Sequence, residues 1–324
     1  MNFILPEDYG AIANGAVDCT SAFQQAVDIS DTALGANYTD HRPIMLFGRK
    51  YRITGTITSK QGALFIGRGP IGANPNQGTT IYHDGPGDCF VWDAGPPPWT
   101  DLASSSAVGG GLRDLSIYKA AKNGANNGGR AIYLRARASS YRPTDFKFEN
   151  VLIAAEASGS TFKDKWYHLI HLDGRDCGPD VGAGIRNCKF LNVRAGIAQG
   201  DPVPTVLLQQ VVGFSAQNLQ LDEGGGGKVT VKVTDLCDTV NFLGVSIGGT
   251  LWFDESVGAG VNGWLCRTTI SGKLTKSLLI ESLSVQGAAS VFADTVQLCQ
   301  GSRFAVLGTI GGQPQLILGV PPWS

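Results

Sequence analysis

A six-residue pattern recurs in this 324-residue chain from residue 112 onward: apolar, any, small or polar, apolar, any, apolar. Between successive copies lies another short apolar run, and the spacing of the copies varies because the connecting segments differ in length. A repeat that tolerates insertions at fixed places is typical of stacked coils. The six copies begin at Leu112, Phe148, Ile185, Ala216, Phe242 and Ile280, and their third positions are Asp114, Asn150, Asn187, Asn218, Gly244 and Ser282.

One coil of this kind cannot bury its inward side chains alone, whereas coils stacked about 4.8 Å apart pair their backbones and share one apolar column. Asn and Asp at the third position suit a tight turn, because both residues tolerate left-handed backbone angles. We therefore predict an all-β fold, a right-handed single-stranded parallel β-helix (a solenoid) with one N-terminal capping α-helix. A β-sandwich with coincidental spacing is the alternative, and helical repeats are disfavoured by the β-branched content.

The composition of the chain limits the kinds of binding partner that we expect. Apolar residues make up 43 % of the chain, charged residues 16 %, and the net charge is −1, so we expect neither nucleic acid nor a membrane surface as partner. The 44 glycines favour many short strands joined by tight turns. Seven cysteines form no CxxC pair, which indicates reduced, buried thiols. No metal site and no cofactor is predicted.

The N-terminal segment contains the one convincing helix. Ser21 and Gln24 have capping-box spacing, and the apolar pattern predicts an end near Ser30. Strand-like runs follow, and residues 95–111 read as a long surface loop. We expect three parts: a capping segment over 1–35, the β-helix over 36–300, and C-terminal strands and tail over 301–324. The early strand-like runs are Ile44 to Phe47, Tyr51 to Ile57, Ala63 to Ile66 and Thr79 to Tyr82.

The opening residues resemble a known family. Asp8-Tyr9-Gly10-Ala11, Asn14-Gly15, Asp18, Thr20 and Ala22-Phe23-Gln24-Gln25-Ala26 are similar to the opening signature of the pectate-lyase-like parallel β-helix superfamily, which includes bacteriophage tailspikes. The resemblance rests on sequence motifs over residues 6–85 and only on the spacing of the repeats over the remainder of the chain. It implies that the helix caps the open end of the column, and we expect Phe23 to plug it.

The resemblance also implies a biological setting. Tailspikes of this family are homotrimers that assemble in the bacterial host cytoplasm, join other phage tail proteins in the virion tail, and bind a bacterial surface polysaccharide. That polysaccharide would be a capsule, an O-antigen or an exopolysaccharide. The signature begins at residue 8, from which we expect no separate head-binding domain before it.

The densest acidic cluster predicts the site. Asp173 and Asp176 follow a strand-like run that carries His171, and they would act as acid and base in glycoside hydrolysis, which needs two carboxylates. Arg175 would bind an acidic sugar. Trp166 and Tyr167 would stack on a sugar ring, and His171 would contact substrate. An acidic turn without function is the alternative for this cluster, and calcium binding is a further one.

Further candidates end other strand-like runs: the carboxylates Glu156, Asp222 and Asp254 as catalytic groups, and Trp252 as a sugar platform. A lyase would need a basic residue near a uronate, and nothing singles one out. The polygalacturonase motifs Asn-Thr-Asp, Asp-Asp, Gly-His-Gly and Arg-x-Lys are missing from the sequence. Whether the chain is an enzyme stays open. The function predicted is a tailspike receptor-binding protein that could also depolymerise its glycan, with hydrolysis favoured over elimination. The alternative is a non-enzymatic adhesin or structural tail protein on the same scaffold.

Overall fold

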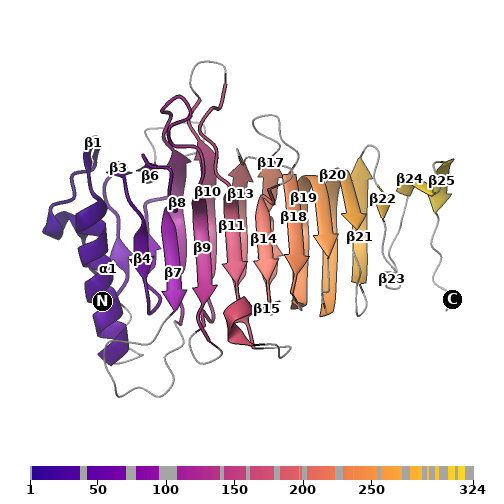
Figure 1. The fold of residues 1–324 in the computed structure, drawn as a ribbon, viewed down its shortest axis with the longest axis horizontal. Coiled ribbons are helices and arrows are strands. Elements are labelled where there is room, and N and C mark those ends of the chain that lie inside the picture. The colour runs from indigo at the N-terminus through magenta and orange to yellow at the C-terminus, as the bar shows by residue number, and fades with distance from the viewer. Residues whose placement is uncertain are drawn as a thin grey trace.

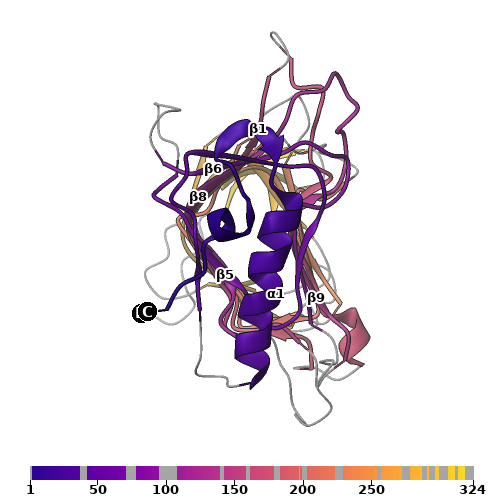
Figure 2. The ribbon, with the colours of Figure 1, turned by 90° about the vertical axis from the view of Figure 1, so that its left-hand side faces the viewer.

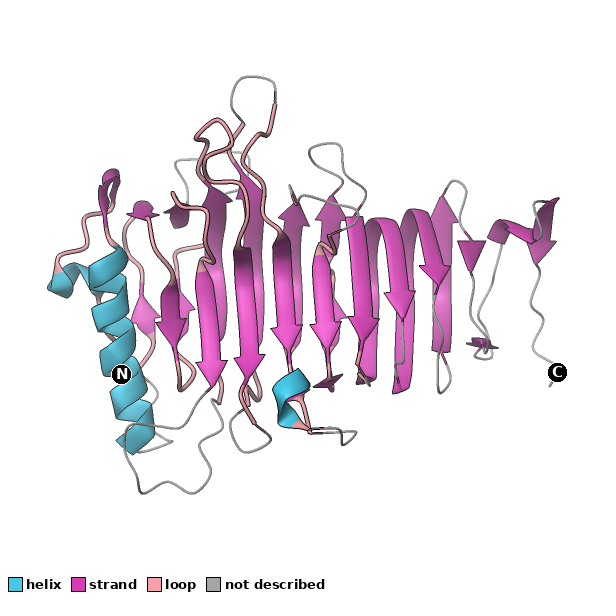
Figure 3. Ribbon diagram, in the orientation of Figure 1, coloured by secondary structure: helices cyan, strands magenta, loops and turns pink. Residues whose placement is uncertain are grey.

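The computed structural model describes residues 2–36, 42–70, 78–94, 108–138, 142–157, 161–178, 183–196, 198, 203–222, 229–235, 237–253, 257–271, 278–286, 290–291, 296–298, 306–310 and 313–317. Side chains are described as far as residue 242, except at 34–36, 222, 229, 230, 238 and 239. The chain winds into coils that stand side by side along one axis (Figure 1). Strands make up the body of the molecule, and the long helix lies at one end (Figure 3).

The strands stack in parallel on three faces, and the coils from β2 to β22 each contribute one strand segment to each face. The first face contains β2 (Ile44–Met45), β5 (Leu64–Ile66), the first halves of β8 (Gly111–Lys119), β10 (Lys147–Ala155) and β13 (Lys189–Gly196), then β16 (Ser215–Gln217), and parts of β19 (Asp238–Phe253), β20 (Val257–Ser271), β21 (Leu278–Gln286) and β23 (Val296–Leu298).

The second face contains β1 (Asn14–Asp18), β3 (Lys50–Ile53), β6 (Thr80–His83), the second halves of β8, β10 and β13, then β17 (Gln220–Asp222) and further parts of β19 to β21. The third face contains β4 (Ile57–Ser59), β7 (Phe90–Ala94), β9 (Arg130–Ala136), β11 (His168–Asp173), β14 (Val206–Gln209), β18 (Val229–Thr234), the ends of β19 and β20, and β22 (Ser290–Val291). These registers make the chain a right-handed parallel β-helix, as predicted.

A few short elements complete the description. Helix η1 (Pro6–Tyr9) opens the chain, η2 (Arg175–Cys177) follows β11, and β12 (Ile185–Arg186) stacks on β15 (Val211–Val212) before the first face. Near the C-terminus, β24 (Val306–Ile310) and β25 (Gln313–Ile317) form an antiparallel pair. None of the helices among the described residues is long and apolar enough to cross a membrane.

The corner between the first and second faces confirms the turn prediction. Asp114, Asn150 and Asn218 adopt left-handed angles, with φ of 56°, 53° and 55°, and Asn192 does so at 53°. Their side chains form a hydrogen-bonded ladder from coil to coil: Asn218 donates to Asn192 (2.9 Å), Asn192 to Asn150 (3.1 Å), and Asn150 to Asp114 (2.9 Å). The ladder fixes the register of successive coils.

One repeat was assigned wrongly from sequence. The pattern placed a copy at Ile185 to Phe190, but Phe190 pairs with Phe148 and Val193 with Val151, so the equivalent copy runs from Phe190 to Ala195. Asn187 also has a left-handed φ of 54°, but it lies in the turn before the first face. The same residue types occur at both turns, and the pattern alone selected the wrong one.

Aromatic side chains fill the column. Rings stack from coil to coil, with Phe148 and Phe190 4.5 Å apart and both inaccessible to solvent. Trp92 from the third face packs edge-on against Phe148 at 5.6 Å. Each such ring contributes about 1.5–3 kcal/mol through burial. The column continues through Phe65, Phe90, Phe214 and Phe242.

Helix α1 (Thr20–Ala36) lies across the open N-terminal end of the column (Figure 2). Phe23 is fully buried there and contacts Tyr51 (5.2 Å) and Phe65 (6.2 Å), which confirms its role as the plug. The helix extends beyond the predicted end at Ser30. Buried Asp31 explains the extension, because its carboxylate accepts hydrogen bonds from the Ser59 hydroxyl and the Lys60 amide and anchors the last turns to β4.

Candidate glycan-binding site

The acidic cluster predicted from sequence lies on the outer side of the third face. Asp173 is the last residue of β11, and Arg175 in η2 folds back onto it. The guanidinium donates from Nε to Oδ1 (2.9 Å) and from Nη2 to Oδ2 (2.9 Å), a bidentate pair. Tyr133 on the neighbouring coil donates a long 3.4 Å hydrogen bond to the same carboxylate. Asp173 is therefore fixed in position by two groups.

Three more arginine–aspartate pairs bridge neighbouring coils around this cluster. Asp176 accepts from Arg135 at 3.1 Å, and its side chain is 52 % exposed. Arg137 donates to Asp93 from Nε at 2.6 Å. Arg130 and Asp88 pair at 2.6 Å. With Arg175–Asp173, four arginines and four aspartates on the coils of β7, β9 and β11 neutralise one another. We call these eight residues the paired surface.

His171 lies at the edge of the paired surface and takes part in a network. Arg130 Nη1 lies 3.3 Å from its Nδ1, and Gln209 Oε1 lies 2.9 Å from its Nε2. Because an arginine can only donate, we assign the ring proton to Nε2. Burial lowers the pKa of His171 to about 4, and Tyr133 stacks on the ring at 4.9 Å. The imidazole is neutral at pH 7, with both nitrogens engaged.

The electrostatics decide what Asp173 can do chemically. Burial by itself raises the pKa of the Asp173 carboxyl, but the hydrogen bonds and charge of Arg175 outweigh burial and hold the pKa below its ordinary value. A glycosidase needs one carboxylic acid with a raised pKa as proton donor. Asp173 is therefore unsuited to be the proton donor. Arginines already engage both Asp173 and Asp176, which disfavours the predicted acid–base pair and also a calcium ion. Arg175 is likewise neutralised, so the structure does not favour it as the ligand of an acidic sugar.

The two aromatic candidates before β11 differ. Trp166 is fully buried: its Nε1 donates to the Ala154 carbonyl (2.9 Å), and His83 and Lys119 cover its ring at 5.4 and 4.1 Å. It is a core residue and cannot stack on a sugar in this conformation. Tyr167 is 46 % exposed and stays available as a platform. Trp166 forms an isolated parallel bridge with Ala198 and Tyr167 lies in the bend that leads into β11, so the two neighbours face different surroundings.

Glu156 lies elsewhere, in a cleft of about 300 Å³ on the second face. Its Oε2 accepts a 3.3 Å hydrogen bond from the Ala121 amide. The opposite carboxylate, Asp84, binds Arg52 (2.6 Å) and Lys122 (3.3 Å). Burial raises the pKa of Asp84 by itself, but bonds from Asn126, Arg52 and Lys122 bring it below the ordinary value. Tyr82 and Lys50 also line this cleft.

The side chains of the remaining candidates lie outside the described part of the chain, so neither site includes them. Asp222 ends β17 and Trp252 lies in β19, but their side chains are outside the described part of the chain, as is Asp254 entirely. Sequence reasoning had not singled out Asp88, Asp93 and Arg130. The register of the strands is the signal that could have identified them. Asp93 is the ladder partner of Arg135, and Arg135 is the ladder partner of Asp173, so the alignment of the coils must be known first.

Fold and site together place the chain in the class of parallel β-helix proteins. Searches found no matching family model and no matching curated protein. Among solved structures, the chain is similar to the surface adhesin PfbA of Streptococcus pneumoniae, with 10 % identity, coverage of 92 % of this chain and 100 % of that one, and a TM-score of 0.46. The A-module of the mannuronan C-5 epimerase AlgE6 of Azotobacter vinelandii shows 14 % identity, the same coverage and the same TM-score. Tailspike protein 3 of bacteriophage CBA120 shows 13 % identity over 97 % of this chain and 64 % of that one, with a TM-score of 0.32.

Proposed function

We propose that this chain binds a bacterial surface polysaccharide through the paired surface and acts as a receptor-binding protein. The observation that carries the proposal is the row of four arginine–aspartate pairs across three successive coils. Their partly exposed guanidinium groups offer donors, and exposed Asp176 with partly covered Asp88 and Asp93 offers acceptors, in fixed positions with no net charge; the Asp173 carboxylate is buried. Such a surface suits the hydroxyl groups of an uncharged glycan, and exposed Tyr167 can stack on a sugar ring.

Binding without cleavage fits the paired surface better than hydrolysis does. Each aspartate in it is bonded to an arginine, and the pKa of Asp173 is held below its ordinary value by Arg175. A rigid, neutral, hydrogen-bonding wall can hold a glycan without transferring a proton to it. The adhesin form of the predicted function is therefore the one we propose for this face.

The test measures binding to capsule, O-antigen and exopolysaccharide preparations from candidate hosts. The double variant Arg135→Gln/Arg175→Gln should weaken binding to the recognised glycan by about tenfold or more, because each lost charge-assisted bond contributes on the order of 1 kcal/mol. Lys163→Gln is the control for a change of charge away from the surface. Unchanged affinity in the double variant contradicts the proposal.

Depolymerisation is the second candidate, and the Glu156 cleft favours it. Here two carboxylates face one cleft in different environments: Asp84 is held ionised by its cations, while Glu156 accepts a hydrogen bond from a backbone amide and forms no ion pair within the described part of the chain. A pair of carboxylates facing one cleft is what glycoside hydrolysis requires. New reducing ends on incubation, abolished by Glu156→Gln, would establish hydrolysis, whereas new absorbance near ~235 nm would indicate elimination.

We also propose that the chain works as a homotrimer in a virion tail, beside other tail proteins. The resemblance of the opening segment supports this, and exposed apolar side chains at the N-terminal end offer a contact surface. Phe3 and Phe47 are each 49 % exposed and pack edge-to-face at 6.0 Å. Sedimentation of the purified chain should give three times the monomer mass, and a stable monomer at micromolar concentration contradicts this part.

A further inference from the structure

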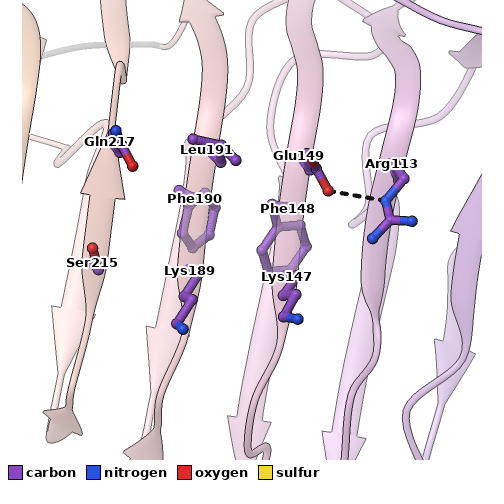
Figure 4. A pocket seen from close by; sticks show the side chains of 9 residues that line it. All are labelled: Arg113, Lys147, Phe148, Glu149, Lys189, Phe190, Leu191, Ser215 and Gln217. Atoms are coloured by element: carbon purple, nitrogen blue, oxygen red, sulfur yellow. Dashed lines mark ion pairs between the residues drawn. The ribbon is translucent and has the colours of Figure 1, made fainter.

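The first face carries a cleft whose charge is not balanced. It encloses about 270 Å³ above β8, β10, β13 and β16. Figure 4 shows its lining residues on four neighbouring coils, where the column residues Phe148 and Phe190 alternate with the polar side chains. We call it the lysine cleft; its outward-facing lining residues are Arg113, Lys147, Glu149, Lys189, Leu191, Ser215 and Gln217, and the buried Phe148 and Phe190 lie at its floor.

Two lysines stand directly above one another in this cleft. Lys147 of β10 and Lys189 of β13 are register partners in a parallel ladder, and both are exposed. Neighbouring coils lie about 4.8 Å apart, and like charges directly opposite each other destabilise a sheet. Within the described part of the chain neither lysine forms an ion pair. The fold therefore holds two cations together without an acid between them.

The one carboxylate of the cleft does not relieve this repulsion. Glu149 Oε2 lies 3.0 Å from Arg113 Nε, so it is already paired on the other side (Figure 4). That contact lacks hydrogen-bond geometry, and the buried Arg113 Nε has no hydrogen-bond acceptor among the described residues. Three cations and one anion leave an excess of two positive charges, so an incoming anion would gain from both lysines.

The rest of the cleft suits a sugar ring. Half-buried Leu191 points outward beside the lysines and gives an apolar patch, and Gln217 and Ser215 supply polar groups on the next coil. The volume is slightly below the ~300–1,000 Å³ of pockets that enclose a complete small ligand. It fits one unit of a longer chain that runs on across the open wall.

We propose that the lysine cleft is a second glycan site, which binds a saccharide unit carrying an anionic group. Lys147 and Lys189 hold the carboxylate or sulfate between them, Leu191 contacts the ring, and Gln217 bonds a hydroxyl. The site is separate from the paired surface and provides affinity for acidic polysaccharide, whereas the paired surface suits a neutral one.

Calorimetric titration of the full chain with hexasaccharides tests the proposal. A carboxylated or a sulfated hexasaccharide should bind with an affinity that falls as salt rises, and a neutral hexasaccharide should not bind to this cleft. The arm that binds more tightly identifies the anionic group. Lys147→Gln/Lys189→Gln should raise the Kd for the acidic ligand about tenfold or more, while Lys163→Gln leaves it unchanged.

Three results would overturn the inference: equal affinity of the Arg135→Gln/Arg175→Gln variant for the neutral and the acidic hexasaccharide, unchanged affinity of the lysine double variant for the acidic one, or tighter binding of a single-stranded oligodeoxynucleotide of similar charge. The exposed lysine substitutions should leave the melting temperature at or above that of the parent, which separates loss of binding from loss of fold. Arg135→Gln/Arg175→Gln should retain acidic binding, so the paired surface can fail its own test without affecting this one.

Discussion

The first and third faces are built on the same coils and the same aromatic column, yet they handle charge in opposite ways. On the third face every arginine of the paired surface has an aspartate partner on its own or the next coil. On the first face Lys147 and Lys189 stack without an acid between them. A β-helix repeats its backbone from coil to coil, so outward side chains alone determine which ligand each wall suits.

The largest effect on stability is expected in the aromatic column, which lies beneath both the first and the third face. Phe148→Ala should lower the free energy of unfolding by about 3–5 kcal/mol, because it opens a cavity between Phe190 and Trp92, which belong to different faces. Chemical denaturation measures the loss, with Phe148→Leu as the milder control. A loss below about 1 kcal/mol would mean that the two faces do not share one column.

Acid should weaken the third face through His171. Its pKa is about 4 in the folded chain against 6.5 ordinarily, so its contribution to stability is complete above pH 6.5 and is lost as pH falls from 6.5 to 4. The loss is on the order of 3 kcal/mol. Asp31, whose pKa burial raises to about 6, acts in the opposite direction over part of this range.

Comparison with His171→Gln isolates the histidine, because Asp31 is common to both proteins. Denaturation at pH 7 and pH 4.5 should show a smaller drop in stability for the variant than for the parent. Parallel drops would show that His171 keeps an ordinary pKa and that the third-face network is looser than described.

The corner beside the first face should be sensitive to the amide ladder. Asn150→Ala removes two ladder hydrogen bonds and places alanine at φ 53°, at an expected loss of about 1–3 kcal/mol. Asn150→Gly removes the same bonds but relieves the backbone angle, so it should lose less. If glycine and alanine are equally destabilising, backbone conformation is not what this position selects.

The smallest effects are shifts in melting temperature, and they should differ in sign between the first and the third face. Asp176→Asn removes a partner of Arg135 and should lower the melting temperature slightly, as loss of an exposed pair does. Lys147→Gln relieves repulsion with Lys189 and should raise it slightly at low salt. Differential scanning fluorimetry at low and high salt measures both, and shifts of the same sign would remove the contrast between the faces.

Much of the architecture could be predicted from the sequence, because the buried positions repeat and inward side chains obey simple packing. The resemblance of the opening segment identified Phe23, and the turn chemistry of asparagine identified the left-handed Asn150 and Asn218. The misplaced copy at Ile185 shows the limit: two turns of one coil use the same residue types, and only backbone pairing reveals that Phe190 stacks on Phe148.

The sites were harder to predict, because they depend on which outward residues meet across coils separated by about forty residues of sequence. Asp173 and Asp176 were found as an acidic cluster, but their arginine partners, which change their chemistry, lie on other strands or fold back from a short helix. Trp166 was expected at the surface and lies in the core, where it covers Lys119. Whether an aromatic residue near the start of a strand points inward or outward depends on the alternation of side chains there. An error of one residue in the predicted strand start therefore reverses the prediction.

The central claim is that one coil stack presents two glycan-binding walls with different charge preferences. The most direct measurement compares binding of a neutral and an acidic host polysaccharide to Arg135→Gln/Arg175→Gln and to Lys147→Gln/Lys189→Gln. We expect the arginine variant to lose the neutral glycan alone and the lysine variant to lose the acidic glycan alone. Equal loss of both glycans in either variant, or no loss in both, would contradict the claim.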